Sequence, residues 1–116
     1  MSNCMKRLMM FSCVFLFISC QVCINEIKKS EKLDKNNKIV LFSRAAGATS
    51  GTSLQISIIR NEKILSNSMK GNICITNGDY LNYQIDDLFI TITYTGELFL
   101  KREKFPNYTI EYIQID

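Results

Sequence analysis

From residue 38 to the C-terminus, the sequence is a series of short apolar or β-branched runs separated by turn-forming residues. The runs lie at 39–42, 54–58, 72–76, 80–85, 88–94, 98–101 and 108–115, and none shows the 3.6-residue apolar period of a helix. Short strands at this spacing are typical of antiparallel β domains. We therefore predict an all-β fold, a small antiparallel sheet or sandwich of about five to seven short strands.

Alternation inside two of these runs predicts which side chains face the core. Successive side chains of a strand point to opposite faces, so every second residue shares a face. In the runs 54–58 and 108–115 the apolar and aromatic residues recur with this period. We expect Leu54, Ile56 and Ile58 to share one face of the first strand. In the second strand we expect Tyr108, Ile110 and Tyr112, with Gln114 as a further candidate, to share one face.

Two short segments are typical of turns. In Asn77-Gly78-Asp79, Asn and Gly accept the positive φ angles of a tight hairpin. We expect this segment to join the runs on either side of it as a hairpin. Asp86-Asp87 is also interpreted as a turn. In a strand the two neighbouring side chains would point to opposite faces, so they would not form a pair of catalytic carboxylates.

The N-terminus has the layout of a secretory signal peptide. Lys6 and Arg7 precede an uncharged apolar run at 8–18, and a positive flank followed by such a run directs export. The run spans about 16 Å as a helix, whereas the hydrocarbon core of a bilayer is about 30 Å thick. We therefore predict that residues 1–19 are a helical signal peptide and not a permanent transmembrane segment.

The end of this run resembles the lipobox of bacterial lipoproteins. It reads Phe17-Ile18-Ser19-Cys20, with a small residue before the cysteine and with Phe17 where the family usually has Leu. The resemblance implies cleavage before Cys20 and attachment of diacylglycerol and palmitate-like acyl chains to this residue. An uncleaved signal anchor, or a secreted protein cut nearby, remains the alternative.

The segment that follows Cys20 is polar. Residues 20–37 hold few large apolar side chains and many Lys, Glu and Asn, which predicts a flexible tether between the lipid and a β domain at 38–116. Lysines and acidic residues are interleaved in this segment, which favours a self-neutralising surface. A weak attraction to anionic lipid headgroups is the alternative.

The net charge argues against nucleic acid as a partner. The formal charge is +3, and removal of Lys6 and Arg7 with the leader lowers it to about +1. Nucleic-acid-binding proteins normally keep a basic face or stripe. The mature chain has none in its sequence, so we expect no nucleic-acid partner.

Two cysteines, Cys23 and Cys74, remain beside Cys20 in the mature chain. They allow one disulfide in an oxidising compartment, but we favour a buried and inert Cys74, since free cysteine is among the most buried residue types. The chain has no His and no second ligand pair beside Cys20 and Cys23. We therefore predict no metal site and no cofactor.

The most distinctive segment is residues 44–58, which reads RAAGATSGTSLQISI. Small residues occupy 45–53 between two predicted strands, and glycines permit backbone conformations closed to other residues. The segment is similar to a motif of small uncharacterised bacterial envelope proteins, often lipoproteins, written R-x-x-G-A-T-[TS]-G-x-S-x-Q-[IV]-S-I. Many members carry an acidic residue and a Cys where this chain has Ala45 and Ala46. The family has no assigned activity, so the resemblance implies a type of protein and not a mechanism.

Three interpretations of this segment are open. It is a tight connection whose hydroxyl groups bond to its own backbone, or a recognition loop for a glycan, peptide or protein, or a phosphate cradle. The last is disfavoured, because Gly51 is followed by a strand and not by Lys and a helix. The candidate recognition residues are Arg44, Gly47, Thr49, Ser50, Gly51, Ser53 and Gln55.

Enzymatic chemistry is not expected. Without His there is no Ser-His-Asp or Cys-His arrangement. The sequence therefore predicts a non-enzymatic, lipid-anchored protein of the cell envelope. We favour the outer membrane over the inner membrane as its location, with the domain facing the periplasm or the cell surface. Its partners are then the membrane and a protein or glycan. The alternative is a periplasmic immunity or inhibitor protein directed against a toxin.

Overall fold

The computed structural model describes residues 23–46 and 51–116, which form an all-β domain. The predictions for the signal peptide and Cys20, and those for Gly47, Thr49 and Ser50, lie outside the described residues. The described parts hold nine strands instead of about five to seven: β1 (Cys23–Lys32), β2 (Asn37–Ala46), β3 (Thr52–Arg60), β4 (Cys74–Thr76), β5 (Leu81–Asp86), β6 (Phe89–Tyr94), β7 (Leu98–Lys101), β8 (Lys104–Phe105) and β9 (Tyr108–Gln114).

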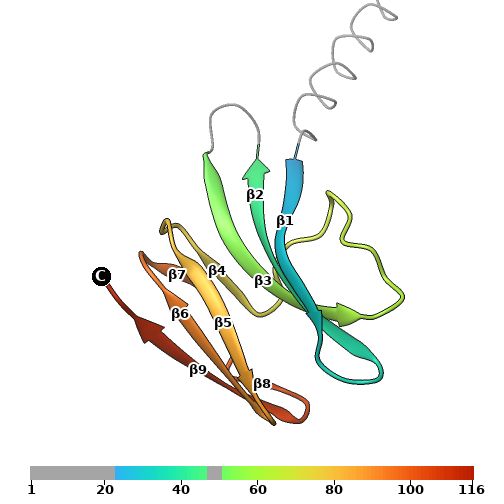
Figure 1. Ribbon diagram of the computed structural model, residues 1–116. Helices are drawn as coiled ribbons and strands as arrows, with labels where there is room; N and C mark the ends of the chain where they lie inside the picture. The colour runs from blue at the N-terminus through green and yellow to red at the C-terminus, as the bar shows by residue number, and fades with distance from the viewer. Residues whose placement is uncertain (1–22, 47–50) are drawn as a thin grey trace, which may run out of the picture.

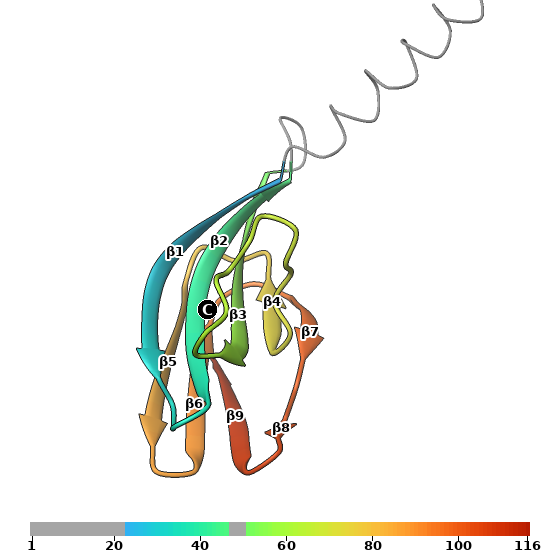
Figure 2. The same cartoon turned by 90° about the vertical axis from the view of Figure 1, so that its right-hand side faces the viewer.

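The strands form two sheets that pack as a sandwich (Figure 1). Sheet A has the order β1-β2-β3-β4-β7, and sheet B has the order β5-β6-β9-β8. Figure 2 shows the strands of sheet A overlying those of sheet B. All pairs are antiparallel except β6 and β9, which run parallel, so the expectation of a purely antiparallel sheet is wrong for this pair. The chain leaves sheet B after β6, adds β7 to sheet A and returns through β8, which brings β9 back in the direction of β6.

The main core lies between the two sheets. Ile39, Leu41, Ile56 and Ile58 contribute from sheet A, and Tyr83, Ile90, Ile92 and Ile110 contribute from sheet B. The alternation predicted for the two runs is confirmed, because Ile56, Ile58, Tyr108 and Ile110 are buried and Leu54 and Tyr112 pack against them. Burial of this apolar surface is the main favourable term in folding.

Strand β1 corrects the expectation of a flexible tether at 20–37. Its residues pair with β2 from Cys23↔Ala46 to Lys32↔Lys38, with one irregularity between Ile27 and Lys29. Most side chains of β1 are exposed, because it is the edge strand of sheet A. Lys29 is an exception that reaches sheet B, where it donates to the carbonyl oxygen of Tyr83 at 3.2 Å. Polar and charged residues on an edge strand prevent pairing with other chains, and the same composition resembles that of a tether.

The hairpin expected at Asn77-Gly78 is also wrong. β4 pairs with β3 and β7 in sheet A, whereas β5 pairs with β6 in sheet B. Gly78 is not among the residues with positive φ. A Cβ atom on Gly78 would instead collide with the backbone and the hydroxyl group of Thr95. Gly78 therefore permits the close approach of Thr95 where the chain passes from one sheet to the other.

The turn at Asp86-Asp87 is confirmed. It joins β5 to β6, whose register runs from Leu81↔Tyr94 to Asp86↔Phe89. Asp87 adopts a φ of 55°, a left-handed conformation that Asp tolerates better than most residues. Asp86 is the last residue of β5 and Asp87 lies in the turn itself, and both side chains are exposed.

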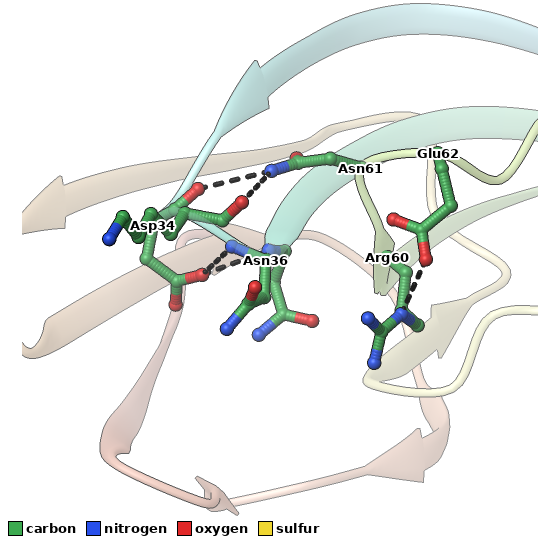
Figure 3. Close-up of polar contacts among 7 residues, drawn as sticks. Asp34, Asn36, Arg60, Asn61 and Glu62 are labelled. Carbon is green, nitrogen blue, oxygen red and sulfur yellow. Dashed lines mark hydrogen bonds and ion pairs between the residues drawn. The ribbon is translucent and has the colours of Figure 1, made fainter.

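Side-chain hydrogen bonds hold the turn between β1 and β2 at one end of the sandwich (Figure 3). Asp34 Oδ1 accepts hydrogen bonds from the backbone N–H groups of Asn36 and Asn37, both at 2.8 Å. The Asn61 side chain donates to the carbonyl groups of Asp34 and Lys35. From β9 of sheet B, the Tyr108 hydroxyl donates to Asp34 Oδ2 at 3.0 Å.

Candidate functional site

The polar residues of the 44–58 motif lie on the outer face of sheet A, away from sheet B. The segment 61–72, which links β3 to β4, crosses this face. Arg44 is only 8% exposed, and its Nη1 donates to the carbonyl oxygens of Asn67 at 2.8 Å and Met69 at 2.9 Å. It also donates to Asn25 Oδ1 at 3.0 Å. Arg44 therefore fastens this segment to the sheet.

Asn25 holds the same segment from β1. It stands opposite Arg44 in the register, and its Nδ2 donates to the carbonyl groups of Ser66 at 2.7 Å and Met69 at 2.8 Å. Its backbone N–H donates to Asn67 Oδ1. Sequence reasoning missed Asn25, because it lies in the segment interpreted as a tether.

Gln55 and Ser57 hold the later part of the segment from β3. Gln55 is buried, its Oε1 accepts from the backbone N–H of Gly71 at 2.7 Å, and its Nε2 donates to Ser53 Oγ at 2.7 Å. Ser57 Oγ donates to the carbonyl oxygen of Lys70 and accepts from the N–H of Asn72. Each side chain thus supplies hydrogen bonds that a strand partner would otherwise supply, since buried backbone groups need partners.

Asn72 completes this arrangement at the edge of β3. Its Oδ1 accepts from the N–H of Ile58 at 2.9 Å, and its Nδ2 donates to the carbonyl oxygen of Ile58 at 2.8 Å. The amide group therefore replaces a strand beyond the point where β4 ends its pairing with β3.

A small second core lies beneath the segment. Val40, Phe42 and Ile59 are buried on the outer face of the sheet, and Leu65 and Met69 pack against them. Arg44 and Gln55 lie on the same face by the alternation of β2 and β3. The segment 61–72 therefore covers an apolar strip that would otherwise face solvent.

The candidate recognition residues are divided by this geometry. Arg44, Ser53 and Gln55 are brought together on the outer face, and Arg44 and Gln55 bond to the covering segment. Gly51 is exposed with a φ of 69°, and a Cβ atom there would have open space around it. Gly47, Thr49 and Ser50 lie outside the described residues. For Arg44, Ser53 and Gln55, the geometry favours the interpretation as internal connections.

A groove of about 610 Å³ lies on the other face of sheet A. Its apolar lining comes from Ile24 of β1, Ala45 of β2 and Leu54 of β3, and the segment 77–79 forms one side. Figure 1 shows this end of the three strands extending past the end of sheet B. The groove is therefore the part of the inner face of sheet A that sheet B does not cover.

The charged residues of the groove are two carboxylates and one ammonium group. Glu26 and Lys28 form an exposed ion pair at 3.2 Å, and Asp79 Oδ1 accepts from the Thr95 hydroxyl at 3.0 Å. Exposed ion pairs contribute little to stability. The groove thus offers an apolar floor with a mixed and slightly acidic rim.

The two described cysteines are both free. Cys74 is fully buried in β4, and this burial raises the pKa of its thiol to about 12. Since the thiolate is the reactive form, a thiol in this state is inert. The interpretation of Cys74 as a buried, unreactive residue is supported.

Metal-ligand groups and membrane-spanning helices are not found among residues 23–46 and 51–116. No three His, Cys, Asp or Glu side chains gather there as metal ligands, and no helix in this part of the chain is long and apolar enough to cross a membrane. The Tyr83 hydroxyl is buried without a hydrogen-bond partner in the described residues. Burial, followed by the charge of Glu31, raises the pKa of Tyr83, so the group stays neutral.

Comparison of the chain with protein-family models, curated proteins and solved structures gives no match.

Proposed function

We propose that the chain is a lipid-anchored protein of the bacterial cell envelope, with a β domain that has a binding or structural role and no catalytic chemistry. The observation that carries the proposal is the sequence of residues 6–20, with two basic residues, an apolar run and Ser19-Cys20. Several acyl chains on Cys20 would hold the protein on a membrane, because each buried methylene contributes about 0.8 kcal/mol.

The polar contacts of the motif support a role without chemistry. A general base, nucleophile or phosphate-binding group must be free to contact a substrate. Arg44 and Gln55 instead bond to the segment 61–72, and the Cys74 thiol is buried with a raised pKa. These residues support the domain and leave binding to its exposed surfaces, where a protein or glycan is the expected partner.

The proposal is tested by metabolic labelling with radioactive palmitate in the native host. The full chain is compared with Cys20→Ser and with Cys23→Ser, which removes a neighbouring thiol and leaves the proposed acceptor intact. We expect label on the full chain and on Cys23→Ser, and none on Cys20→Ser. Labelling of the Cys20→Ser protein, or no labelling of any of the three, would remove the lipid anchor from the account.

A further inference from the structure

We propose that the groove lined by Ile24, Ala45 and Leu54 lies against the lipid of the membrane that anchors the chain. The inference rests on the proposed lipid anchor at Cys20. In this proposal the domain does not move freely on a tether but is held in a defined orientation. The end of sheet A where β1 begins then faces the bilayer.

The number of residues between the anchor and the domain carries the first step. β1 begins at Cys23, so only Gln21 and Val22 separate it from Cys20. A fully extended chain spans at most about 3.3–3.6 Å per residue. The Cα atom of Cys23 therefore lies within about 11 Å of the Cα atom of the lipid-bearing residue.

The second step is that β1 does not act as a spacer. Its pairing with β2 starts at its first residue, with Cys23↔Ala46 and Ile24↔Ala45. Asn25 then makes three hydrogen bonds, two from its side chain and one from its backbone, to the segment 61–72. Detaching this end of β1 from the sheet would break both sets of contacts, so the anchor pulls on the domain directly.

The third step is the position of the groove. Ile24 lies one residue into β1 and is 55% exposed, and it lines the groove together with Ala45 and Leu54. Thr52, at the start of β3, lines the same groove and pairs with Ala45. The apolar floor is therefore at the end of the domain that the short connection holds near the bilayer.

The charges of the groove indicate the kind of lipid. Glu26 and Asp79 carry negative charge, and Lys28 carries one positive charge beside Glu26. Anionic headgroups would be repelled by the two carboxylates, whereas the ammonium group of a zwitterionic headgroup would be attracted to them. We therefore assign zwitterionic phospholipid as the occupant, with its acyl chain region facing Ile24.

The opposite end of the sandwich provides a reference position. Along β3, Thr52 and Arg60 are eight residues apart, which corresponds to about 26 Å. Arg60 and Phe105 line a common hollow at that far end. Asn107 follows Phe105 in the exposed turn between β8 and β9, at the end away from the start of β1 (Figure 2).

The experiment uses tryptophan fluorescence, because the chain contains no Trp. Thr52→Trp and Asn107→Trp each introduce a single Trp at an exposed position, and excitation at the red edge of the absorption band avoids the five Tyr residues. The full-length lipidated proteins are placed in phosphatidylcholine vesicles with or without brominated acyl chains, which quench tryptophan on contact. Vesicle flotation reports the anchor separately from the orientation. Ile24→Trp serves as a second probe of the groove.

We expect Thr52→Trp to lose about half of its emission in brominated vesicles and Asn107→Trp to lose almost none. The brominated acyl chains quench only a Trp side chain that lies at the membrane interface and contacts them. Insertion of about ten Gly and Ser residues between Val22 and Cys23 should restore the emission of Thr52→Trp, because it restores a flexible tether. If the proteins float and Thr52→Trp and Ile24→Trp are not quenched, the orientation is wrong and the anchor stands. Equal quenching at both ends also contradicts it. If the proteins do not float, the anchor fails, and the orientation fails with it.

Discussion

Arg44 of β2 and Asn25 of β1 stand opposite each other in sheet A and donate to the same carbonyl oxygen, that of Met69, at 2.9 and 2.8 Å. A third hydrogen bond joins Arg44 Nη1 to Asn25 Oδ1 at 3.0 Å. The two side chains thus form one clamp that holds the segment 61–72 over the apolar strip at Val40 and Phe42. The clamp gives the first residue of the 44–58 motif a structural role.

Replacing Arg44 by Ala should lower the free energy of unfolding by about 2–3 kcal/mol, because it removes the charged donor to the Asn67 carbonyl group and one of the two donors to the Met69 carbonyl group. Urea unfolding followed by circular dichroism measures the change. Arg60→Ala is the matched control, since the Arg60 side chain is exposed and forms an exposed ion pair with Glu62, and it should change stability by less than about 1 kcal/mol. Equal effects of the two substitutions would contradict the clamp.

Gly78→Ala should destabilise the domain by about 1–3 kcal/mol, the usual cost of forcing a methyl group into packed space. The cause is the close approach of the Thr95 backbone. Gly51→Ala is the comparison, because its φ of 69° is strained for Ala but the space around it is open; it should cost about 1–2 kcal/mol. Thermal unfolding of both variants measures the two losses of stability, and an unchanged Gly78→Ala protein would argue against the observed path between the sheets.

Cys74 should not react with a thiol reagent at about pH 8 while the protein is folded. Its pKa of about 12 leaves roughly one thiol in ten thousand ionised at that pH, and the side chain is fully buried. Cys23 is only half-buried and should react first. The test is a time course of modification in residues 21–116, which contain only the cysteines Cys23 and Cys74, with and without urea. Rapid modification of both thiols without urea would show that β4 is not buried as described.

The turn at Asp34 should make stability depend on acid. The backbone N–H groups of Asn36 and then Asn37 hold the pKa of Asp34 below its ordinary value of 3.8. The folded-state pKa is therefore depressed, so the stabilisation is present above about pH 3.8 and is lost as the pH falls through the folded-state pKa. Urea titrations at several pH values should give a smaller loss of stability in acid for Asp34→Asn than for the unchanged chain. An identical pH dependence for both proteins would show that Asp34 does not contribute.

The strands that could be predicted are those whose side chains alternate. In β3 and β9 the apolar residues that face the core alternate with mostly polar ones, and local alternation records that difference directly. The outer face of β9 is exposed, whereas the outer face of β3 is buried as well. β1 could not be recognised, because an edge strand with exposed side chains on both faces has no apolar period. The parallel pairing of β6 with β9 depends on residues far apart in the chain, and no local pattern encodes it.

The candidate site shows the same limit. The sequence singled out Arg44, Ser53 and Gln55 as candidate recognition residues of the 44–58 motif, and in the structure they share one face of sheet A. Their role depends on the segment 61–72, which lies across that face and has no signal of its own in the sequence. Likewise, the sequence indicates that Gly78 is needed for the backbone conformation, but its role is decided by the close approach of Thr95 and not by a local turn preference.

The mass of the N-terminal peptide of the mature protein, purified from the membranes of the native host, tests the central claim most directly. The account predicts a peptide that begins at Cys20 and carries the added mass of diacylglycerol on that residue. A mature chain that begins at any other residue, or an unmodified Cys20 in the membrane-bound protein, would contradict it.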